Sequence, residues 1–220
     1  MYRLLSIRRR AFTLPEIIVS LFLTLLLLTL LVSFLVPCLR ATQTGTIRVE
    51  LQQESLLALG RVMADLESTV TAAITVQASG SSPETGPVYL AVIPVESVNS
   101  DGLQVWKQSI VLYYWKEAGS PLIRKEWTPS SPPSLGLVSG DIKPTVVTNA
   151  MMSQIASETA LRGKILARDV KEFRVKSLTT SLSLSSPIEV FISLERRGGT
   201  GKKDAEKFSL ARNVTLRNEL

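Results

Sequence analysis

The sequence predicts an α+β protein in which one long N-terminal α-helix packs against an antiparallel β-sheet. Three features of the 220-residue chain predict this fold. The N-terminal part holds an unbroken apolar run, the next segment has apolar residues at helical spacing, and the rest contains several apolar or alternating stretches typical of strands. A sheet that buries one face needs a cover, which the long helix supplies.

The apolar run is long enough to cross a lipid bilayer. Phe12 to Val36 comprises 25 residues, about 37 Å as an α-helix, whereas a hydrocarbon core measures about 30 Å. The apolar core of a secretory signal peptide is shorter, about 7–15 residues. Four arginines precede the run: Arg3, Arg8, Arg9 and Arg10. The positive-inside rule therefore predicts a cytoplasmic N-terminus and an extracytoplasmic body after Arg40.

Charge and composition exclude several classes of function. The net charge is +6, but without residues 1–11 the chain has 21 basic and 19 acidic residues, a net of +2. A nucleic-acid partner is therefore not expected. The chain has no histidine, which excludes Ser-His-Asp and Cys-His mechanisms and removes the commonest metal ligand. A Ser-Lys dyad stays open, but no motif marks one. We expect no enzyme activity, no cofactor and no metal.

The single cysteine, Cys38, cannot form an internal disulfide. It follows Pro37 at the end of the apolar run, whereas lipid-modification sites generally have a small residue in that place. We interpret Cys38 as a small apolar residue near the outer membrane interface and keep a lipoprotein as the alternative.

The start of the apolar run reads Arg8-Arg9-Arg10-Ala11-Phe12-Thr13-Leu14-Pro15-Glu16 and resembles the prepilin signature of type IV pilins and pseudopilins. The resemblance implies a pilin-like fold, cleavage between Ala11 and Phe12 by a prepilin peptidase, and methylation of Phe12. It also implies that Glu16 attracts the N-terminal amine of a neighbouring subunit and sets the axial register. Ala11 replaces the usual glycine. Pro15 replaces the usual aliphatic residue and is acceptable in a first helical turn.

A carboxylate at the edge of a membrane span is usually functional, so Glu16 is the main candidate residue. The alternative is a tolerated interfacial glutamate in a plain membrane anchor.

The chain divides into four predicted segments. Residues 1–11 are the basic leader, 12–39 the transmembrane and assembly half of the helix, 40–77 its amphipathic outer half, and 78–220 the β-rich extracytoplasmic domain. The predicted helix runs from Thr13 to Ile74, about 90 Å. Three residues are sites where it can bend: Pro37, Gly45 and Gly60. The apolar stripe of the outer half consists of Ile47, Leu51, Leu56, Leu59, Met63, Leu66, Val70 and Ala73.

The body is predicted to be mostly β-structure. After a turn-rich linker at 78–87, we expect strands at 88–95, 109–115, 122–127, 170–178, 188–195 and 207–216, a loop at 128–144 and a short helix at 158–168. Three tryptophans are expected in the core or on a sheet face: Trp106, Trp115 and Trp127. A basic cluster in the loop 196–205 is interpreted as a solvated hairpin tip, with contact to an acidic partner or DNA as the alternative: Arg196, Arg197, Lys202 and Lys203.

Scattered patterns in the body are similar to J-type minor pseudopilins: Arg61-Val62-Met63-Ala64-Asp65, Tyr113-Tyr114-Trp115, Leu122-Ile123-Arg124 and Leu216-Arg217-Asn218. This resemblance implies a structural minor subunit at the tip of a type II secretion pseudopilus. The implied location is the bacterial inner membrane, crossed once, and then the filament.

The implied partners are other pilins or pseudopilins, the prepilin peptidase, the inner-membrane assembly platform and membrane lipid. One alternative is a minor type IV pilin or competence pseudopilin serving adhesion, motility or DNA uptake. Another is an uncleaved bitopic membrane-anchored binding module.

Overall fold

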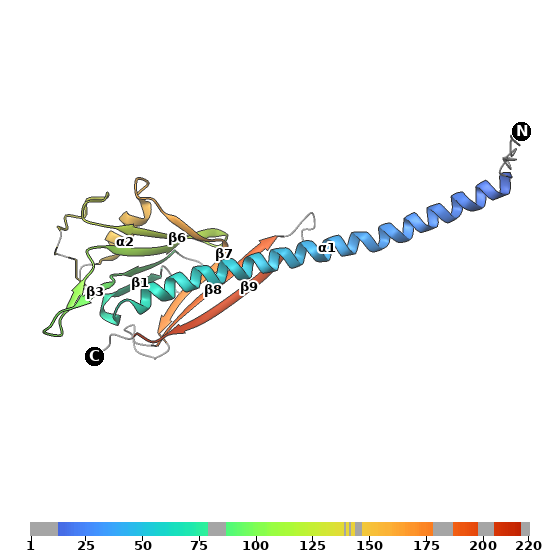
Figure 1. Cartoon of the computed structure of the whole chain (residues 1–220). Coiled ribbons are helices and arrows are strands. Elements are labelled where there is room, and N and C mark those ends of the chain that lie inside the picture. Colours follow the sequence, from blue (N-terminus) through green and yellow to red (C-terminus); the bar gives the residue numbers. More distant parts are fainter. Residues whose placement is uncertain are drawn as a thin grey trace, which may run out of the picture. The chain divides into compact units, whose positions relative to one another are not determined.

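The computed structural model describes residues 13–78, 87–138, 140, 142–143, 147–177, 187–197 and 205–216 (Figure 1). The chain separates into two units, Met1–Gly45 and Thr46–Leu220, and each is described by itself. The predicted linker at 78–87 lies almost wholly outside the described residues, as do Ala11 and Phe12.

The long N-terminal helix is confirmed, but it ends earlier than predicted. Helix α1 spans Leu14–Glu67, 54 residues, and continues through Pro37; at 1.5 Å per residue its length is about 81 Å. After Glu67 the chain turns, because the Thr69 amide donates to the Leu66 carbonyl at 3.2 Å and the Thr69 hydroxyl donates to the Ile93 carbonyl. The predicted helix end at Ile74 and the segment boundary at residue 77 are therefore wrong.

The residues beyond this turn form a strand that was not predicted. A single 3₁₀ turn, η1 (Thr71–Ala73), leads into β1 (Ile74–Ala78). Strand β1 pairs antiparallel with β2 (Val88–Val92), with Ile74 opposite Val92. The segment is rich in β-branched residues, which favour strands over helices. Its apolar residues recur at a helical spacing by coincidence.

The sheet has seven antiparallel strands in the order β1-β2-β5-β6-β7-β8-β9. The remaining bounds are β5 Ile110–Trp115, β6 Ser120–Trp127, β7 Lys164–Ser177, β8 Ile188–Arg197 and β9 Ala205–Val214. Between β2 and β5 the chain forms a separate two-stranded ribbon of β3 (Val95–Val98) and β4 (Gln104–Trp106). The expected strands after residue 87 are confirmed, although β2 ends at Val92 instead of 95 and β7 begins at Lys164 instead of 170. The ribbon was not predicted.

Both faces of the central strands are covered. On one face the outer part of α1 packs through Leu51, Leu59 and Leu66, with residues such as Tyr113 and Trp115 beneath it. On the other face lie helix α2 (Asn149–Ser157) and the loop before it. Strand β5 is therefore apolar at almost every position, whereas β8 alternates because only its α1 side is fully covered.

The stripe predicted on the outer half of α1 is only partly buried. Leu51, Leu59, Met63 and Leu66 are in the core, while Leu56 is exposed. Val70 and Ala73 lie beyond the helix and belong to the second core, on the α2 side of the sheet.

The helix predicted at 158–168 is wrong, because α2 precedes it and β7 begins at Lys164. Helix α2 begins after Thr148, whose hydroxyl accepts a hydrogen bond from the Met151 amide at 3.3 Å. Of the apolar residues predicted on this helix, Leu161 lies in the bend after α2, and Ile165 and Leu166 lie in β7 itself. A Cβ added at Gly163 would lie 2.7 Å from the Ile123 Cγ2 atom, so any side chain there would force Ile123 to shift.

The tryptophan prediction is confirmed in the described part of the chain. Trp115 and Trp127 are fully buried, one on each side of the sheet, and Trp106 is half-buried against the second core.

Candidate anchoring and assembly site

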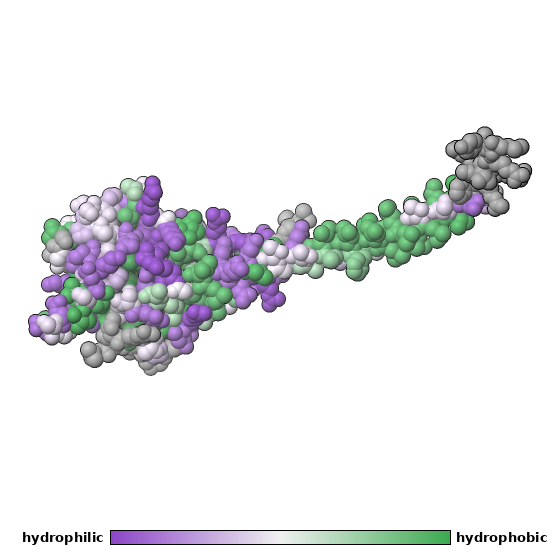
Figure 2. Space-filling model, viewed as in Figure 1, coloured by the Kyte–Doolittle hydropathy of each residue, from purple (hydrophilic) through white to green (hydrophobic). Residues whose placement is uncertain are grey.

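The first part of α1 presents a continuous apolar surface. Every large apolar side chain from Leu14 to Leu39 is exposed, and Figure 2 shows this stretch as an almost unbroken hydrophobic surface. Its most apolar 18-residue window has a mean hydropathy of 2.8. Water-soluble surfaces rarely expose so large an apolar patch. This helix is long and apolar enough to cross a membrane.

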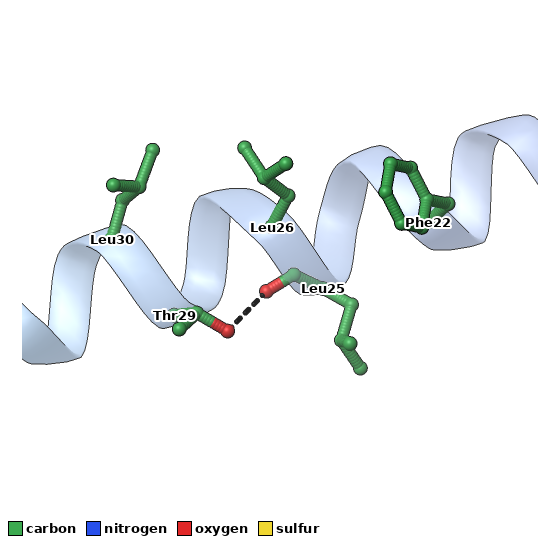
Figure 3. A pocket seen from close by; sticks show the side chains of 5 residues that line it. All are labelled: Phe22, Leu25, Leu26, Thr29 and Leu30. Atoms are coloured by element: carbon green, nitrogen blue, oxygen red, sulfur yellow. Dashed lines mark hydrogen bonds between the residues drawn. The ribbon is translucent and has the colours of Figure 1, made fainter.

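The hydroxyl groups of this stretch are satisfied within the helix. The Thr29 hydroxyl donates to the Leu25 carbonyl at 2.8 Å, in a shallow apolar depression that also involves Phe22, Leu26 and Leu30 (Figure 3). Three further hydroxyls donate in the same way to carbonyls three or four residues earlier: Ser20, Thr24 and Ser33. In lipid, where no water can replace a missing partner, such bonds remove the cost of burying a hydroxyl.

Glu16 lies in the first turn of α1. The Thr13 carbonyl accepts from the amides of Glu16 and Ile17 at 3.0 and 3.2 Å, so Thr13 is the residue that caps the helix. The Glu16 carboxylate oxygen Oε2 in turn accepts from the Thr13 amide and hydroxyl, each at 3.4 Å. This is the carboxylate half of a capping box, with long hydrogen bonds, because the Thr13 hydroxyl donates to Glu16 and does not accept from its amide. The acidic side chain also suits the positive end of the helix dipole.

Of the three residues predicted for processing and register, the structure describes Glu16 alone. Cys38 is exposed and free, on the same helix after Pro37.

A buried polar cluster fastens the outer part of α1 to the sheet. The Arg124 Nε atom donates to Asp65 Oδ2 at 2.9 Å, and the Tyr113 hydroxyl donates to the same oxygen. The side chains of Arg124 and Asp65 are 13% and 12% exposed. Burial, followed by the hydrogen bond to Asp65, raises the pKa of Tyr113, so the phenol stays protonated. Burial alone would lower the pKa of Arg124, but Asp65 raises it above its ordinary value.

A second ionic cluster corrects the prediction for Arg196. This residue lies within β8, not in a solvated hairpin tip. Its guanidinium lies 2.7 Å from Asp169, 3.2 Å from Glu50 and 3.1 Å from Glu54, the last two on α1. The reason is the strand period: Arg196 continues the row of β8 side chains that face α1. Arg197 ends β8 and is exposed, while Lys202 and Lys203 lie outside the described residues.

Asp169 reaches Arg196 because β7 is irregular at this point. The φ angle of Asp169 is 53°, which is in the left-handed region. The register of β7 against β8 shifts directly after Val170. A bulge of this kind redirects a side chain out of the regular alternation. The sequence carries two signals for this cluster: the acidic pair Glu50 and Glu54 one helical turn apart, and the alternation of β8, which extends to Arg196.

Comparison with models of protein families, with curated proteins and with solved structures gave no match to this chain.

Proposed function

We propose that the chain is a pilin-like subunit of a bacterial filament, processed by a prepilin peptidase and assembled through its N-terminal helix. One observation carries this proposal. A single helix has an exposed, predominantly apolar first part, and its outer part is fastened to one antiparallel sheet. A membrane anchor alone needs no such continuity, whereas a subunit that moves from a bilayer into a filament core needs an apolar helix that continues into its body, as α1 does from Leu14 to Glu67.

The sequence around the start of α1 supports the same proposal. Cleavage between Ala11 and Phe12 would leave a positive amine four residues before Glu16. Within the described chain, the Glu16 carboxylate contacts Thr13, and neither contact neutralises its charge. An uncompensated carboxylate at the edge of a bilayer is costly. The amine of a neighbouring subunit would remove this cost and set the axial register.

Within this class, the body favours a minor pseudopilin-like subunit of a type II secretion pseudopilus. The quoted patterns around Asp65, Tyr113 and Arg124 support this choice, and these three residues form one cluster. A minor pilin for adhesion, motility or DNA uptake is the second candidate. The chain would act as a structural subunit in the inner membrane and the filament, without chemistry of its own.

The mature protein is expected to begin at Phe12 and to carry an N-terminal methyl group. The measurement is mass spectrometry of the N-terminal peptide, from cells with and without a prepilin peptidase. Ala11→Leu should block cleavage, since the peptidase cuts after a small residue, whereas Ser6→Ala in the leader should not. A mature chain that keeps Met1, or starts elsewhere, would favour the bitopic binding module and defeat the pilin proposal.

Glu16→Ala is expected to leave membrane insertion intact and to reduce filament assembly strongly. The variant removes a charge-assisted hydrogen bond worth about 1.5–3 kcal/mol per subunit contact. Membrane fractionation and quantification of sheared filaments measure the two effects. Glu67→Ala, at the exposed far end of α1, is the matched control and should assemble normally. Normal assembly of Glu16→Ala would remove Glu16 from the mechanism.

A further inference from the structure

A cleft lies on the side of the sheet opposite α1, between α2 and the strands β2 and β5. Its volume is about 550 Å³, within the range of small-molecule sites. Its floor is a pair of tyrosines, Tyr89 and Tyr114, which are direct neighbours across the two strands. Their chain neighbours Leu90, Tyr113 and Trp115 belong to the core under α1. By the alternation of strands, both tyrosine rings therefore face the cleft.

Polar groups converge on this aromatic floor. Ser153, from α2, lines the opposite wall, and Lys116 and Glu117 follow directly after β5. Neither the Tyr114 hydroxyl nor the Ser153 hydroxyl forms a hydrogen bond in the described part of the chain. Burial, followed by the proximity of Tyr89, raises the pKa of Tyr114, so its hydroxyl is a neutral donor and acceptor at physiological pH.

The charged side chains that line the cleft balance each other. Lys116 and Glu117 bring opposite charges. The carbonyls at the C-terminal end of α2 would attract a cation, but Lys125 already occupies them, donating to Ala156 at 2.8 Å and to Ile155 at 3.2 Å. The Lys125 ammonium also lies 5.5 Å from the centre of the Tyr114 ring. The cleft therefore suits a neutral molecule with one apolar face and several hydrogen-bonding groups.

We propose that this cleft binds a saccharide. The accessible parts of the Tyr89 and Tyr114 rings would cover the apolar face of a sugar ring, and Tyr114, Ser153 and the Lys116–Glu117 pair would bind its hydroxyls. An extended peptide fits less well, because β2 and β5 are inner strands whose backbone groups are paired on both sides. The site is independent of the proposed filament function, since it uses no residue of α1.

The test is saturation-transfer difference NMR on the full chain in lauryldimethylamine oxide, a detergent without a sugar headgroup. The probes are chitotriose, cellotriose and maltotriose, with glycerol and a proline-rich hexapeptide as non-saccharide probes. We expect saturable binding in the millimolar range for at least one trisaccharide and none for glycerol or the peptide. Binding of the peptide alone, or no saturable binding of any trisaccharide, would overturn the proposal.

Three variants locate the binding in the cleft. Tyr114→Phe and Ser153→Ala each remove one hydroxyl and should weaken binding roughly two- to tenfold, whereas Tyr89→Ala removes half the floor and should abolish it. Gln154→Ala, next to Ser153 on α2 but outside the cleft, is the control. Because Ser153 is exposed, its loss should not affect folding. Binding that is unchanged in both Tyr114→Phe and Ser153→Ala would place the saccharide elsewhere and also overturn the proposal.

Discussion

Asp65→Ala is expected to lower the free energy of unfolding by about 3–5 kcal/mol, because it leaves a buried guanidinium without its counter-charge. Arg124 and the Tyr113 hydroxyl both donate to the Asp65 carboxylate. Without it, the charge of Arg124 stays next to the core, and Glu126, 3.4 Å from its Nη1 atom, compensates only in part. Domains of this size have total stabilities of about 5–15 kcal/mol, so the loss would be a large fraction. Equilibrium urea unfolding in detergent, followed by circular dichroism, measures it.

Arg61→Ala is the matched control for this prediction. Arg61 also pairs with Asp65, at 3.4 Å, but its side chain is 51% exposed. An exposed pair one helical turn apart contributes about 0.3–0.5 kcal/mol. If Asp65→Ala and Arg61→Ala destabilise the protein equally, the buried cluster does not hold α1 to the sheet.

Trp115→Ala is expected to cost a similar amount, about 3–5 kcal/mol, through the cavity it creates in the core under α1. Trp115 is fully buried, and its indole nitrogen donates to the Val170 carbonyl at 3.1 Å. Trp115→Phe fills most of the space and removes only the indole donor, because the Val170 carbonyl still accepts from the Gly119 amide at 2.8 Å. It should cost about 0.5–1.5 kcal/mol.

Trp106→Phe provides the comparison at a half-buried site on the ribbon and should change stability by less than about 1 kcal/mol. The same urea titration distinguishes the three variants. A cost for Trp115→Phe as large as that for Trp115→Ala would assign the effect to the hydrogen bond instead of the cavity.

The parts of the fold that were predictable are those with an unambiguous local period. Strand β8 alternates from Ile188 to Leu194, and its pairing with β9 follows from a second run of the same kind. The apolar stretch of α1 is equally clear. The predictions were wrong where the apolar residues of one segment fit both a helical and a strand spacing. Val70 and Ala73 continue the helical spacing of α1 although they follow its end, and Leu161 and Ile165 suggest a helix where the chain enters β7.

The candidate sites also differ in whether a local pattern in the sequence marks their residues. Glu16 could be predicted as a candidate residue because the motif that marks it consists of its immediate neighbours in the chain. Arg196 could have been placed by extending the alternation of β8 by one step. By contrast, Asp65 and Arg124 are 59 residues apart, and no local pattern links them. The cleft between α2 and β5 could not be predicted either, because the helix was predicted at 158–168 and not at the position of α2.

The two ionic clusters also determine how the body would respond to mechanical force. Arg196 holds α1 at Glu50 and Glu54, and Arg124 holds it at Asp65, about 16 Å further along the helix from Glu54. Tension applied along the axis of α1 would act on both attachments at once, as shear parallel to the helix. The helix could slide only if both clusters and the apolar contacts between them broke together. The body would therefore transmit pulling forces without unfolding one strand at a time.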